Sequence, residues 1–263
     1  MNINRKIDYI LIPMAGKGKR YKKENFKTIK PLILVDNETI FEKSIKSLPN
    51  CNKKIAILKK NIFSKNLVIN KIFKKEKINH FLLTKNTKGQ ADTIYKLKNN
   101  IDSAKNALVH SCDYIMKYSS NKFSKIFPNS DAIVFVYRLK SRIIKDYKSF
   151  AYCKINKKSN RVLKIVEKKT ISNEPWNDYM VVGTFWFKKI EFFFNAHEIA
   201  LRKNQKINGE FYVANNINNL INLNYKVSFL EVDQWINLGD FFDFNQYVYY
   251  KNFFLNNNDL IRC

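Results

Sequence analysis

The feature that most constrains the fold is a series of nine short apolar runs, rich in β-branched and aromatic residues and separated by segments of helical spacing. The runs cover residues 7–14, 54–58, 78–83, 107–111, 132–138, 150–155, 162–166, 180–187 and 227–232. Several are continuous rather than alternating, which is typical of strands covered on both faces. Between the early runs, apolar residues recur every three or four positions, as at Phe41, Ile45 and Leu48. This order predicts an α/β fold with a mostly parallel central sheet and helices on both faces.

After about residue 130 the runs follow one another more closely, which favours antiparallel pairing. The stretch "FAYCKINKKSNRVLKIVEK" predicts a hairpin that turns at residues 158–160. Helical patterns follow over 191–201, 209–221 and 239–250. We therefore expect a small antiparallel annex. Because only five prolines and six glycines occur, no linker divides the chain. The sequence predicts a single domain over 1–263, with halves at about 1–115 and 116–250 and a polar tail over 251–263.

Length and composition indicate a globular protein without a membrane span. A chain of 263 residues can bury a sizeable core. No apolar run approaches the roughly 18 residues that a spanning helix needs. The apolar segment near the amino end has no small-residue cleavage site, so we expect a soluble, cytoplasmic protein. The four cysteines share no metal-type spacing, which favours reduced and mostly buried thiols.

The chain is strongly basic, with 48 Lys and Arg against 22 Asp and Glu, a net charge of +26. Such a charge alone would favour a polyanionic partner, and a basic nucleic-acid-binding module is one alternative that the composition leaves open. Lysine is spread over nearly every segment, however, whereas nucleic-acid binders gather charge on one face or interleave it with stacking aromatics. We therefore expect solvated surface charge, no nucleic acid, and a positive field that attracts phosphorylated small molecules.

The first apolar run ends in "PMAGKGKR", which places Gly16 and Gly18 just beyond the carboxyl end of a strand. Open α/β sheets bind ligands at that edge, and glycines let backbone N–H groups approach phosphate oxygens. The loop lacks the third glycine of a Rossmann fingerprint and the Gly-Lys-Ser/Thr of a Walker A loop. By itself the pattern fits a phosphate-binding loop or an ordinary turn about equally well.

Seven segments together, in this order, resemble the sugar-phosphate nucleotidyltransferase family. The first segment is "GKGKR" followed by "IKPLILVDNETIFEKSIKSL". It resembles the opening of the family, approximately G-x-G-[ST]-R followed by P-K-P-L and a helix. The later matches are "TKGQADTIY", "ALVHSCDY", "VEKK", "YMVVGTFWF", "NGEFYVANNINNLI" and "WINLGDFFDF". They cover about residues 8–248. The resemblance implies a Rossmann-like nucleotidyltransferase fold, with a nucleotide-binding half followed by an acceptor-binding half. It also implies that the chain joins an NTP to a phosphorylated acceptor and releases pyrophosphate.

The resemblance assigns the nucleotide and catalytic residues to the first half. The residues implied to bind the nucleotide are Ala15, Gly16, Lys17, Gly18, Lys19, Gly89, Gln90 and Ala91. Arg20 would bind the departing pyrophosphate, and Lys30 would contact the α-phosphate and the acceptor phosphate, since cations stabilise the charge that crowds in the transition state. The alternatives are a solvated lysine for Lys30 and, for "GQAD", a helix cap that involves Asp92.

The resemblance places the acceptor and a Mg²⁺ ion in the second half and at the strand end before it. The implied acceptor-binding residues are Asp113, Glu167, Lys168, Gly183 and Glu210. Asp113 would also bind Mg²⁺, with Asn237 or Asp240 as the second ligand. Alternatives from the residues alone are a turn-forming aspartate at 113, surface charge at 167 and 168, and a glutamate at 210 that only stabilises a helix N-terminus.

The sequence departs from the family pattern at Lys19, Ile29 and Asn237, where relatives commonly have Ser or Thr, Pro and Asp. Asn can still ligate Mg²⁺ through its carbonyl oxygen. The resemblance favours a sugar 1-phosphate acceptor and a role in capsule or surface-polysaccharide synthesis. Three alternatives remain: a cytidylyltransferase for a non-sugar phosphate such as phosphocholine, a ligand-sensing relative without turnover, and the nucleic-acid-binding module. The sequence leaves open whether the chain forms a homo-oligomer.

Overall fold

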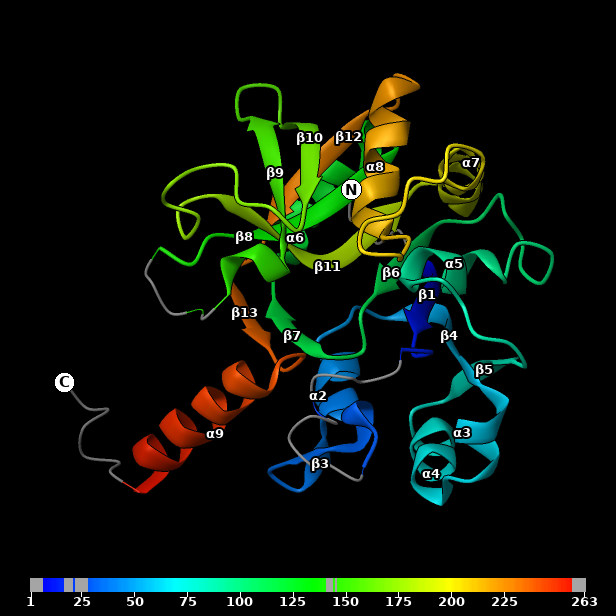
Figure 1. Ribbon diagram of the computed structural model, residues 1–263, viewed down its shortest axis with the longest axis vertical. Coiled ribbons are helices and arrows are strands. Elements are labelled where there is room, and N and C mark those ends of the chain that lie inside the picture. The colour runs from blue at the N-terminus through cyan, green and yellow to red at the C-terminus, as the bar shows by residue number, and fades with distance from the viewer. Residues whose placement is uncertain (1–6, 17–20, 22–27, 141–143, 145, 257–263) are drawn as a thin grey trace.

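The computed structural model describes residues 7–16, 21, 28–140, 144 and 146–256, and its centre is one large mixed sheet (Figure 1). The sheet has nine strands in the order β5-β4-β1-β6-β11-β8-β12-β10-β9. In chain order they are β1 (Ile7–Pro13), β4 (Cys51–Lys59), β5 (Ile78–Leu83), β6 (Ala107–His110), β8 (Ala132–Tyr137), β9 (Ala151–Asn156), β10 (Arg161–Glu167), β11 (Tyr179–Phe187) and β12 (Val227–Glu231). Each of the nine apolar runs is therefore a strand, as predicted.

The first half of the chain forms parallel strands, as the sequence predicts. β4 lies between β5 and β1, and β1 lies between β4 and β6, with every neighbouring pair parallel. The carboxyl ends of these strands therefore lie along one edge of the sheet. That edge carries residues 14–16, which follow β1.

The second half corrects the prediction of a mostly parallel sheet with a separate antiparallel annex. β11 pairs antiparallel with both β6 and β8, so it joins the two halves in one continuous sheet. β12 is parallel to β8, whereas β10 pairs antiparallel with β12 and β9. The β9–β10 hairpin turns where the sequence predicts, with Asn160 at φ 53°. The sheet is mixed because β11 returns between strands that the sequence pattern alone does not pair.

Two small antiparallel sheets, which the sequence analysis does not predict, lie beside the large one. β7 (Tyr114–Lys117) pairs with β13 (Gln234–Asn237), and β2 (Leu34–Val35) pairs with β3 (Glu38–Thr39). The β7–β13 pair brings the segment after β6 against the segment before the last helix. It therefore places Asn237, the last residue of β13, opposite Tyr114, which directly follows Asp113.

Helices cover both faces of the sheet, as predicted. They are α2 (Ile40–Lys46), α3 (Lys60–Ser64), α4 (Leu67–Lys75), α5 (Gln90–Tyr95), α6 (Ser120–Ile126), α7 (Ile190–Arg202), α8 (Val213–Asn222) and α9 (Phe241–Asn256), with short 3-10 turns η1 (Lys30–Leu32), η2 (Phe127–Asn129) and η3 (Tyr147–Ser149). α8 begins four residues later than the pattern from residue 209 predicts. α9 continues to Asn256, so part of the segment expected as a polar tail is helical.

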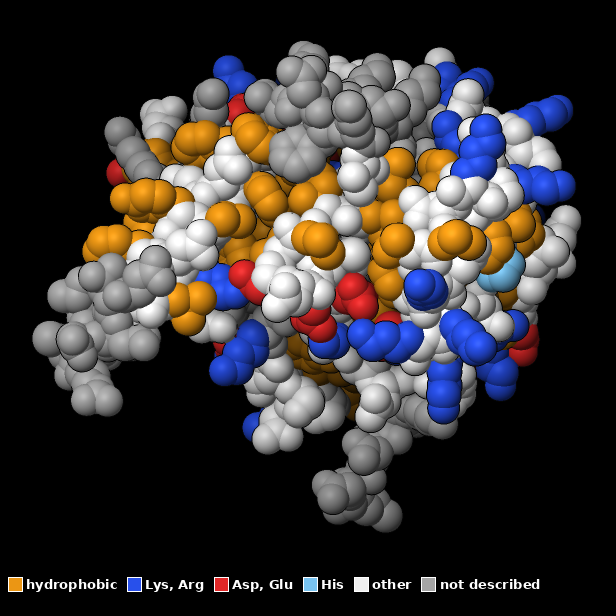
Figure 2. All heavy atoms as spheres, turned by 90° about the horizontal axis from the view of Figure 1, so that it is seen from below, with side chains coloured by type: hydrophobic (Ala, Val, Ile, Leu, Met, Phe, Trp, Pro, Cys, Tyr) orange, Lys and Arg blue, Asp and Glu red, His pale blue; other side chains and the backbone are white. Residues whose placement is uncertain are grey.

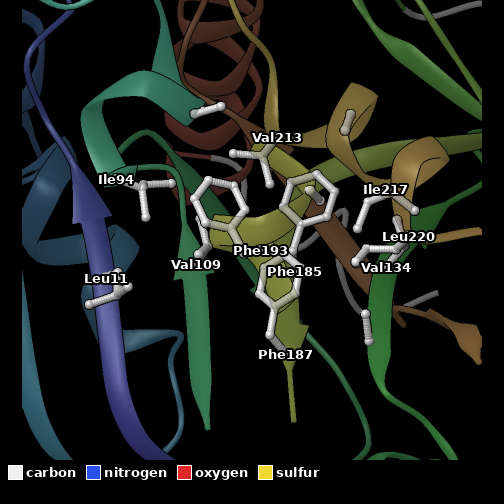
Figure 3. Close-up of a cluster of buried hydrophobic side chains, with 14 of the residues drawn as sticks. Leu11, Ile94, Val109, Val134, Phe185, Phe187, Phe193, Val213, Ile217 and Leu220 are labelled. Carbon is white, nitrogen blue, oxygen red and sulfur yellow. The ribbon is translucent and has the colours of Figure 1, made fainter. Parts of the chain in front are cut away.

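Alternation along the strands divides the core into two clusters, one on each face of the sheet. Leu11 points to a cluster completed by α5, α7 and α8, in which Ile94, Phe193 and Ile217 pack on the strands (Figure 3). Ile10 and Ile12 point the other way, into a cluster that includes residues of α2 and α4. The packing on both faces fixes the sheet, and with it the strand ends that carry the predicted site.

α2 begins sharply because Thr39 and Glu42 form a capping box. The Glu42 N–H donates to Thr39 Oγ1 at 3.1 Å, and the Thr39 N–H donates to Glu42 Oε2 at 3.0 Å. The Ile40 N–H also donates to the Ile33 carbonyl oxygen at 2.9 Å, just after η1. These bonds hold the segment that carries Lys30 against the body of the protein.

Figure 2 shows one face of the molecule, on which Lys and Arg side chains occur at several separate places and a few acidic ones lie between them. In the described part of the chain, no helix has both the length and the apolar character needed to cross a membrane. Cys112 and Cys153 are buried free thiols, and Cys51 is half-buried.

Candidate active site

The carboxyl ends of β1 and β6 lie side by side because the two strands are parallel neighbours. After β1 come Ala15, which is buried, and Gly16, which is exposed. Asp113 follows the end of β6 and is buried. The structure thus places these predicted residues at the edge where open α/β sheets bind ligands. The other predicted residues of the glycine loop lie outside the described residues; they are Lys17, Gly18, Lys19 and Arg20.

Lys30 and Asp113, which are 83 positions apart in the sequence, form an ion pair between Nζ and Oδ2. Lys30 begins η1, directly followed by Pro31, which suits the first turn of such a helix because it has no N–H to leave unpaired. The Lys30 side chain is 20% exposed and that of Asp113 is 8% exposed. A lysine this far from bulk water is held by the fold, which argues against the alternative of a freely solvated side chain.

Asn237 and Asp113 present oxygen atoms to a common point beside Gly239. A Cβ atom on Gly239 would lie 2.6 Å from Asp113 Oδ2 and 3.0 Å from Asn237 Oδ1. The Leu238 N–H donates to the Asp113 carbonyl oxygen at 2.9 Å, which ties the two segments together. The Gly239 N–H donates to Asn237 Oδ1 at 2.9 Å. Gly239 therefore has to lack a side chain for the two oxygens to converge.

This pair of oxygens fits a Mg²⁺ ion that is shared with a bound triphosphate. Mg²⁺ prefers oxygen ligands and is commonly held by one or two protein carboxylates, with phosphates and water supplying the rest. In the described residues, no group of three or more His, Cys, Asp or Glu side chains could hold a metal by itself.

Asp240, the other predicted metal ligand, caps the last helix. Its Oδ1 accepts from the Phe242 N–H at 3.0 Å, and its carbonyl oxygen accepts from the Phe244 N–H at 3.0 Å. These are the bonds of an N-cap residue before α9. The convergence at Gly239 involves Asn237 instead, whose Nδ2 donates to Asp243 Oδ2 at 2.5 Å.

The predicted base-binding segment starts α5, and its glycine has a packing role. Gly89 has φ 109°, and a Cβ there would lie 2.5 Å from the Phe211 carbonyl oxygen. Ala91 is buried, and its N–H donates to the same oxygen at 3.1 Å. Gln90 Nε2 donates to Ser111 Oγ at 3.3 Å, beside the end of β6. Asp92 accepts from the Lys88 N–H at 2.7 Å, which agrees with the predicted helix-capping alternative.

Glu167 and Lys168 lie together at the end of β10. Glu167 is 9% exposed, and burial raises its pKa to about 7, although Lys168 lowers it. Lys168 has φ 58° and its Nζ lies 3.8 Å from Glu167 Oε1. The ammonium also donates to the Ser149 carbonyl oxygen and lies 5.4 Å from the centroid of the Tyr212 ring. The two residues are thus partly enclosed, which disagrees with the surface-charge alternative.

Gly183 and Glu210, both predicted at the acceptor side, differ in their surroundings. Gly183 has φ 84°, and a Cβ there would lie 2.3 Å from Cε2 of Tyr114. Its lack of a side chain therefore makes room for the tyrosine ring that follows Asp113. Glu210 is exposed and pairs through its backbone with Ile207, at 3.0 Å in both directions. Because α8 begins only at Val213, Glu210 is not in its first turn.

Three residues of this region were missed by the sequence analysis. Gly239 and Tyr114 lie next to predicted positions, and the close approaches that give them their roles come from segments far away in the chain. His110 lies under the site in a buried hydrogen-bond chain. In the sequence, the one sign of this role is that a histidine interrupts the apolar run before Asp113.

The raised pKa of Glu167 predicts a specific pH dependence of stability. Between pH 4.5, the ordinary pKa of a glutamate side chain, and about pH 7, Glu167 is protonated in the folded protein and ionised in the unfolded chain. Its contribution to the free energy of unfolding is therefore complete below pH 4.5 and is lost as the pH rises through about 7. For Glu167→Gln, which cannot ionise, the stability relative to the native protein should rise by on the order of 3 kcal/mol from pH 4.5 to pH 9. Urea unfolding across this range measures the difference.

Glu210→Gln is the control, since the side chain that it alters is exposed. Its stability should follow that of the native protein at every pH. Parallel curves for Glu167→Gln and the native protein would show that Glu167 is not held protonated by burial.

No model of a known protein family matches the sequence, and no curated protein matches it. Several solved structures do match the fold. The nucleoside-diphosphate-sugar pyrophosphorylase from Vibrio cholerae RC9 has a TM-score of 0.71 at 21% identity, over 91% of this chain and 99% of that one. The inositol-1-phosphate CTP transferase from T. maritima has a TM-score of 0.71 at 13% identity, over 93% and 94%. The UTP-bound UGPase from Acinetobacter baumannii has a TM-score of 0.68 at 14% identity, over 93% of each chain.

These neighbours match nearly the whole length of the chain, so the likeness concerns the complete architecture. The fold is the one found in sugar-phosphate nucleotidyltransferases, as the resemblance in the sequence implies. At this level of sequence identity the comparison shows the fold alone, and the chemistry has to be inferred from the residues of this chain.

Proposed function

We propose that this protein is a nucleotidyltransferase that joins an NTP to a sugar 1-phosphate, giving an NDP-sugar and pyrophosphate. The observation that carries the proposal is the pairing of Lys30 with Asp113 at the carboxyl edge of β1 and β6. In this fold, that edge holds one fixed cation and one buried carboxylate, at the same edge as Gly16. These groups are what a site needs to bring two phosphates together and to bind a metal ion with them.

In the proposed reaction, an oxygen of the acceptor phosphate attacks the α-phosphorus of the NTP. The bond from the α-phosphorus to the oxygen that bridges to the β-phosphate breaks, and pyrophosphate leaves with that oxygen. In this proposal the Lys30 ammonium would neutralise oxygens of both the acceptor phosphate and the α-phosphate. A cation already fixed in place needs little reorganisation during the reaction, which is the main advantage of such a site over water.

Asp113 and Asn237 would hold Mg²⁺ through side-chain oxygens, since both side chains approach the same point beside Gly239. When bound, the ion would neutralise phosphate charge and orient the triphosphate. We favour Asn237 over Asp240 because an oxygen of Asn237 approaches the same point beside Gly239 as Asp113 does, whereas the Asp240 carboxylate caps α9. Arg20, in the loop outside the described residues, stays the candidate for binding pyrophosphate.

For the acceptor we propose the region of Glu167, Lys168 and Gly183. The Lys168 ammonium, held near the Tyr212 ring and the Ser149 carbonyl oxygen, would bind the acceptor phosphate. Glu167, partly protonated near neutral pH, would exchange hydrogen bonds with acceptor hydroxyl groups. This places the acceptor in the second half of the chain and the nucleotide in the first.

The test is a matrix of CTP, UTP, dTTP, GTP and ATP against phosphorylated acceptors with Mg²⁺, with pyrophosphate release as the readout. A sugar 1-phosphate in the productive pair supports the proposal. Non-sugar phosphates, among them inositol 1-phosphate and phosphocholine, belong in the panel because one neighbour in fold is named as an inositol-1-phosphate CTP transferase. Release with a non-sugar phosphate alone would identify the alternative acceptor class, and silence with every pair would refute both.

Gly239→Ala should impair the proposed metal site without disturbing the fold. The added Cβ would lie 2.6 Å from Asp113 Oδ2, so the carboxylate must move away from its present position. Disturbing the groups around a metal site typically lowers metal affinity or activity by roughly 10–100-fold. We expect a loss of that size in turnover, accompanied by a higher Mg²⁺ requirement, in a titration of activity against Mg²⁺.

Gly209→Ala provides the control, because a Cβ at Gly209 would meet nothing within 4 Å. Gly209 has φ 79°, so this variant should lose some stability yet keep its Mg²⁺ dependence. An unchanged Mg²⁺ titration for Gly239→Ala would remove this point from the proposed metal site.

A further inference from the structure

A buried chain of hydrogen bonds runs beneath the candidate site, centred on His110. Its Nε2 lies 2.9 Å from Ser44 Oγ, and its Nδ1 lies 2.8 Å from Thr184 Oγ1. All three side chains are 0% exposed. The Ser44 hydroxyl lies a further 3.2 Å from the Ser111 carbonyl oxygen, to which it can donate.

The three side chains come from the three segments that build the site. Ser44 is in α2, which follows η1 and its Lys30. His110 ends β6, which leads to Asp113. Thr184 is in β11, directly after Gly183, whose carbonyl oxygen accepts from the Ser111 N–H at 3.3 Å. One imidazole therefore joins the lysine segment, the aspartate segment and the acceptor strand.

The partners of the imidazole select one of its two neutral tautomers. If Nε2 carries the proton, it donates to Ser44 Oγ, Ser44 donates to the Ser111 carbonyl oxygen, and Thr184 donates to Nδ1. With the proton on Nδ1, Ser44 must donate to Nε2, and the Thr184 hydroxyl is left with the weak acceptor Met116 Sδ at 3.6 Å. The first arrangement uses the stronger acceptor, a carbonyl oxygen, and satisfies each group.

The hydrogen-bond chain around His110 is also suited to stay uncharged while anions bind above it. Burial lowers the pKa of His110 to about 4, against smaller opposing influences from Asp113 and from a hydrogen bond with the backbone of Tyr114. At neutral pH the imidazole is therefore uncharged, with one donor and one acceptor. A neutral group with two fixed partners sets the positions of its neighbours without adding charge to the site.

We propose that His110 is a positioning residue for nucleotidyl transfer. With its proton on Nε2, the imidazole links Ser44 and Thr184. It thereby sets the positions of Lys30, Asp113 and Gly183 relative to one another. This inference rests on the proposed function, because it concerns the placement of the groups to which that function assigns the chemistry. It adds a residue that acts through the three segments it joins rather than on the reacting phosphates.

The decisive variant is the triple replacement Ser44→Ala, His110→Leu and Thr184→Val. It removes the hydrogen bonds together with their side-chain polar groups, so that none of the three side chains leaves an unpaired polar atom in the core. We expect a folded protein by circular dichroism whose kcat falls roughly 10–100-fold, as for other groups that orient a site. The KM for the NTP should stay close to that of the native protein. The single variant His110→Gln retains Ser44 and Thr184 and keeps a donor toward Ser44. Its kcat should therefore lie between those of the triple variant and the native protein.

His197→Leu is the matched control. His197 is also a 0% exposed histidine and has Asn216 Nδ2 at 3.0 Å from its Nδ1, but it lies in α7. The His197→Leu variant should lose stability and keep the native kcat. That result would separate the positioning role of His110 from the general effect of removing a polar side chain from the core.

Nitrogen NMR of the His110 imidazole in the native protein tests the tautomer directly. We expect a protonated Nε2 and an unprotonated Nδ1 at pH 7. A proton on Nδ1, or a triple variant with the kcat of the native protein, would overturn the inference while leaving the proposed function intact. A native protein without turnover on any substrate pair would instead refute the proposed function, and the inference with it.

Discussion

Lys30→Met is expected to lower turnover by about 10²–10³-fold, the loss seen when one preorganised group is removed from a site that stabilises developing negative charge. The reason is that Lys30 lies in a fixed place at the edge of β1 and β6, with only 20% of its side chain exposed. Methionine keeps much of the length and removes the charge. The rate of pyrophosphate release at saturating substrates measures the effect.

Lys43→Met is the matched control for this variant. The Lys43 side chain is 17% exposed and pairs with Asp36 Oδ2 at 3.0 Å, so it has similar burial and also an acidic partner. It should keep the turnover of the native protein. If Lys30→Met retained most of its activity while remaining folded, Lys30 would not be the group that neutralises the reacting phosphates.

Asp113→Asn is expected to cost a similar factor, roughly 10²–10³-fold in turnover, with a higher Mg²⁺ requirement. The substitution keeps the shape of the side chain and removes the negative charge that pairs with Lys30 and converges with Asn237. A titration of activity against Mg²⁺ separates the two consequences, since excess metal should recover part of the rate.

Asp8→Asn controls for the loss of an aspartate in the same sheet. Asp8 lies near the opposite end of β1 and accepts from the Asn106 N–H at 3.2 Å, so turnover should not change. Because Lys30 and Asp113 act as one unit, the double variant should be little slower than the slower single variant. Two losses that multiply would indicate that the two side chains act independently.

The strands were predictable because each is a local apolar run, whereas the pairing of β11 was not. The segment "YMVVGTFWF" is apolar on both faces, as a strand in the middle of a sheet has to be. Nothing in it specifies β6 and β8 as its neighbours, since pairing depends on contacts across long sequence distances. The short strands β2, β3, β7 and β13 were missed because two to four residues carry too little pattern.

The family resemblance assigned Lys30 and Asp113 to one site without pairing them, and it did not give the packing roles of the glycines. In the sequence, Gly89 and Gly183 fit close approach by a ligand. In the structure, the Phe211 backbone and the Tyr114 ring occupy the space where their side chains would be. Both neighbours come from distant segments of the chain. Similarly, the sequence gives His110 no partners, because Ser44 and Thr184 reach it only in the folded sheet.

The most direct test of the account is phosphorus NMR of the native protein with Mg²⁺, an NTP and the acceptor selected by the substrate matrix. We predict a new pair of diphosphate resonances from the joined product, together with an equal amount of pyrophosphate, and neither signal with Lys30→Met. If orthophosphate alone accumulated, or if Lys30→Met formed the product at the native rate, nucleotidyl transfer at the Lys30–Asp113 site would be contradicted.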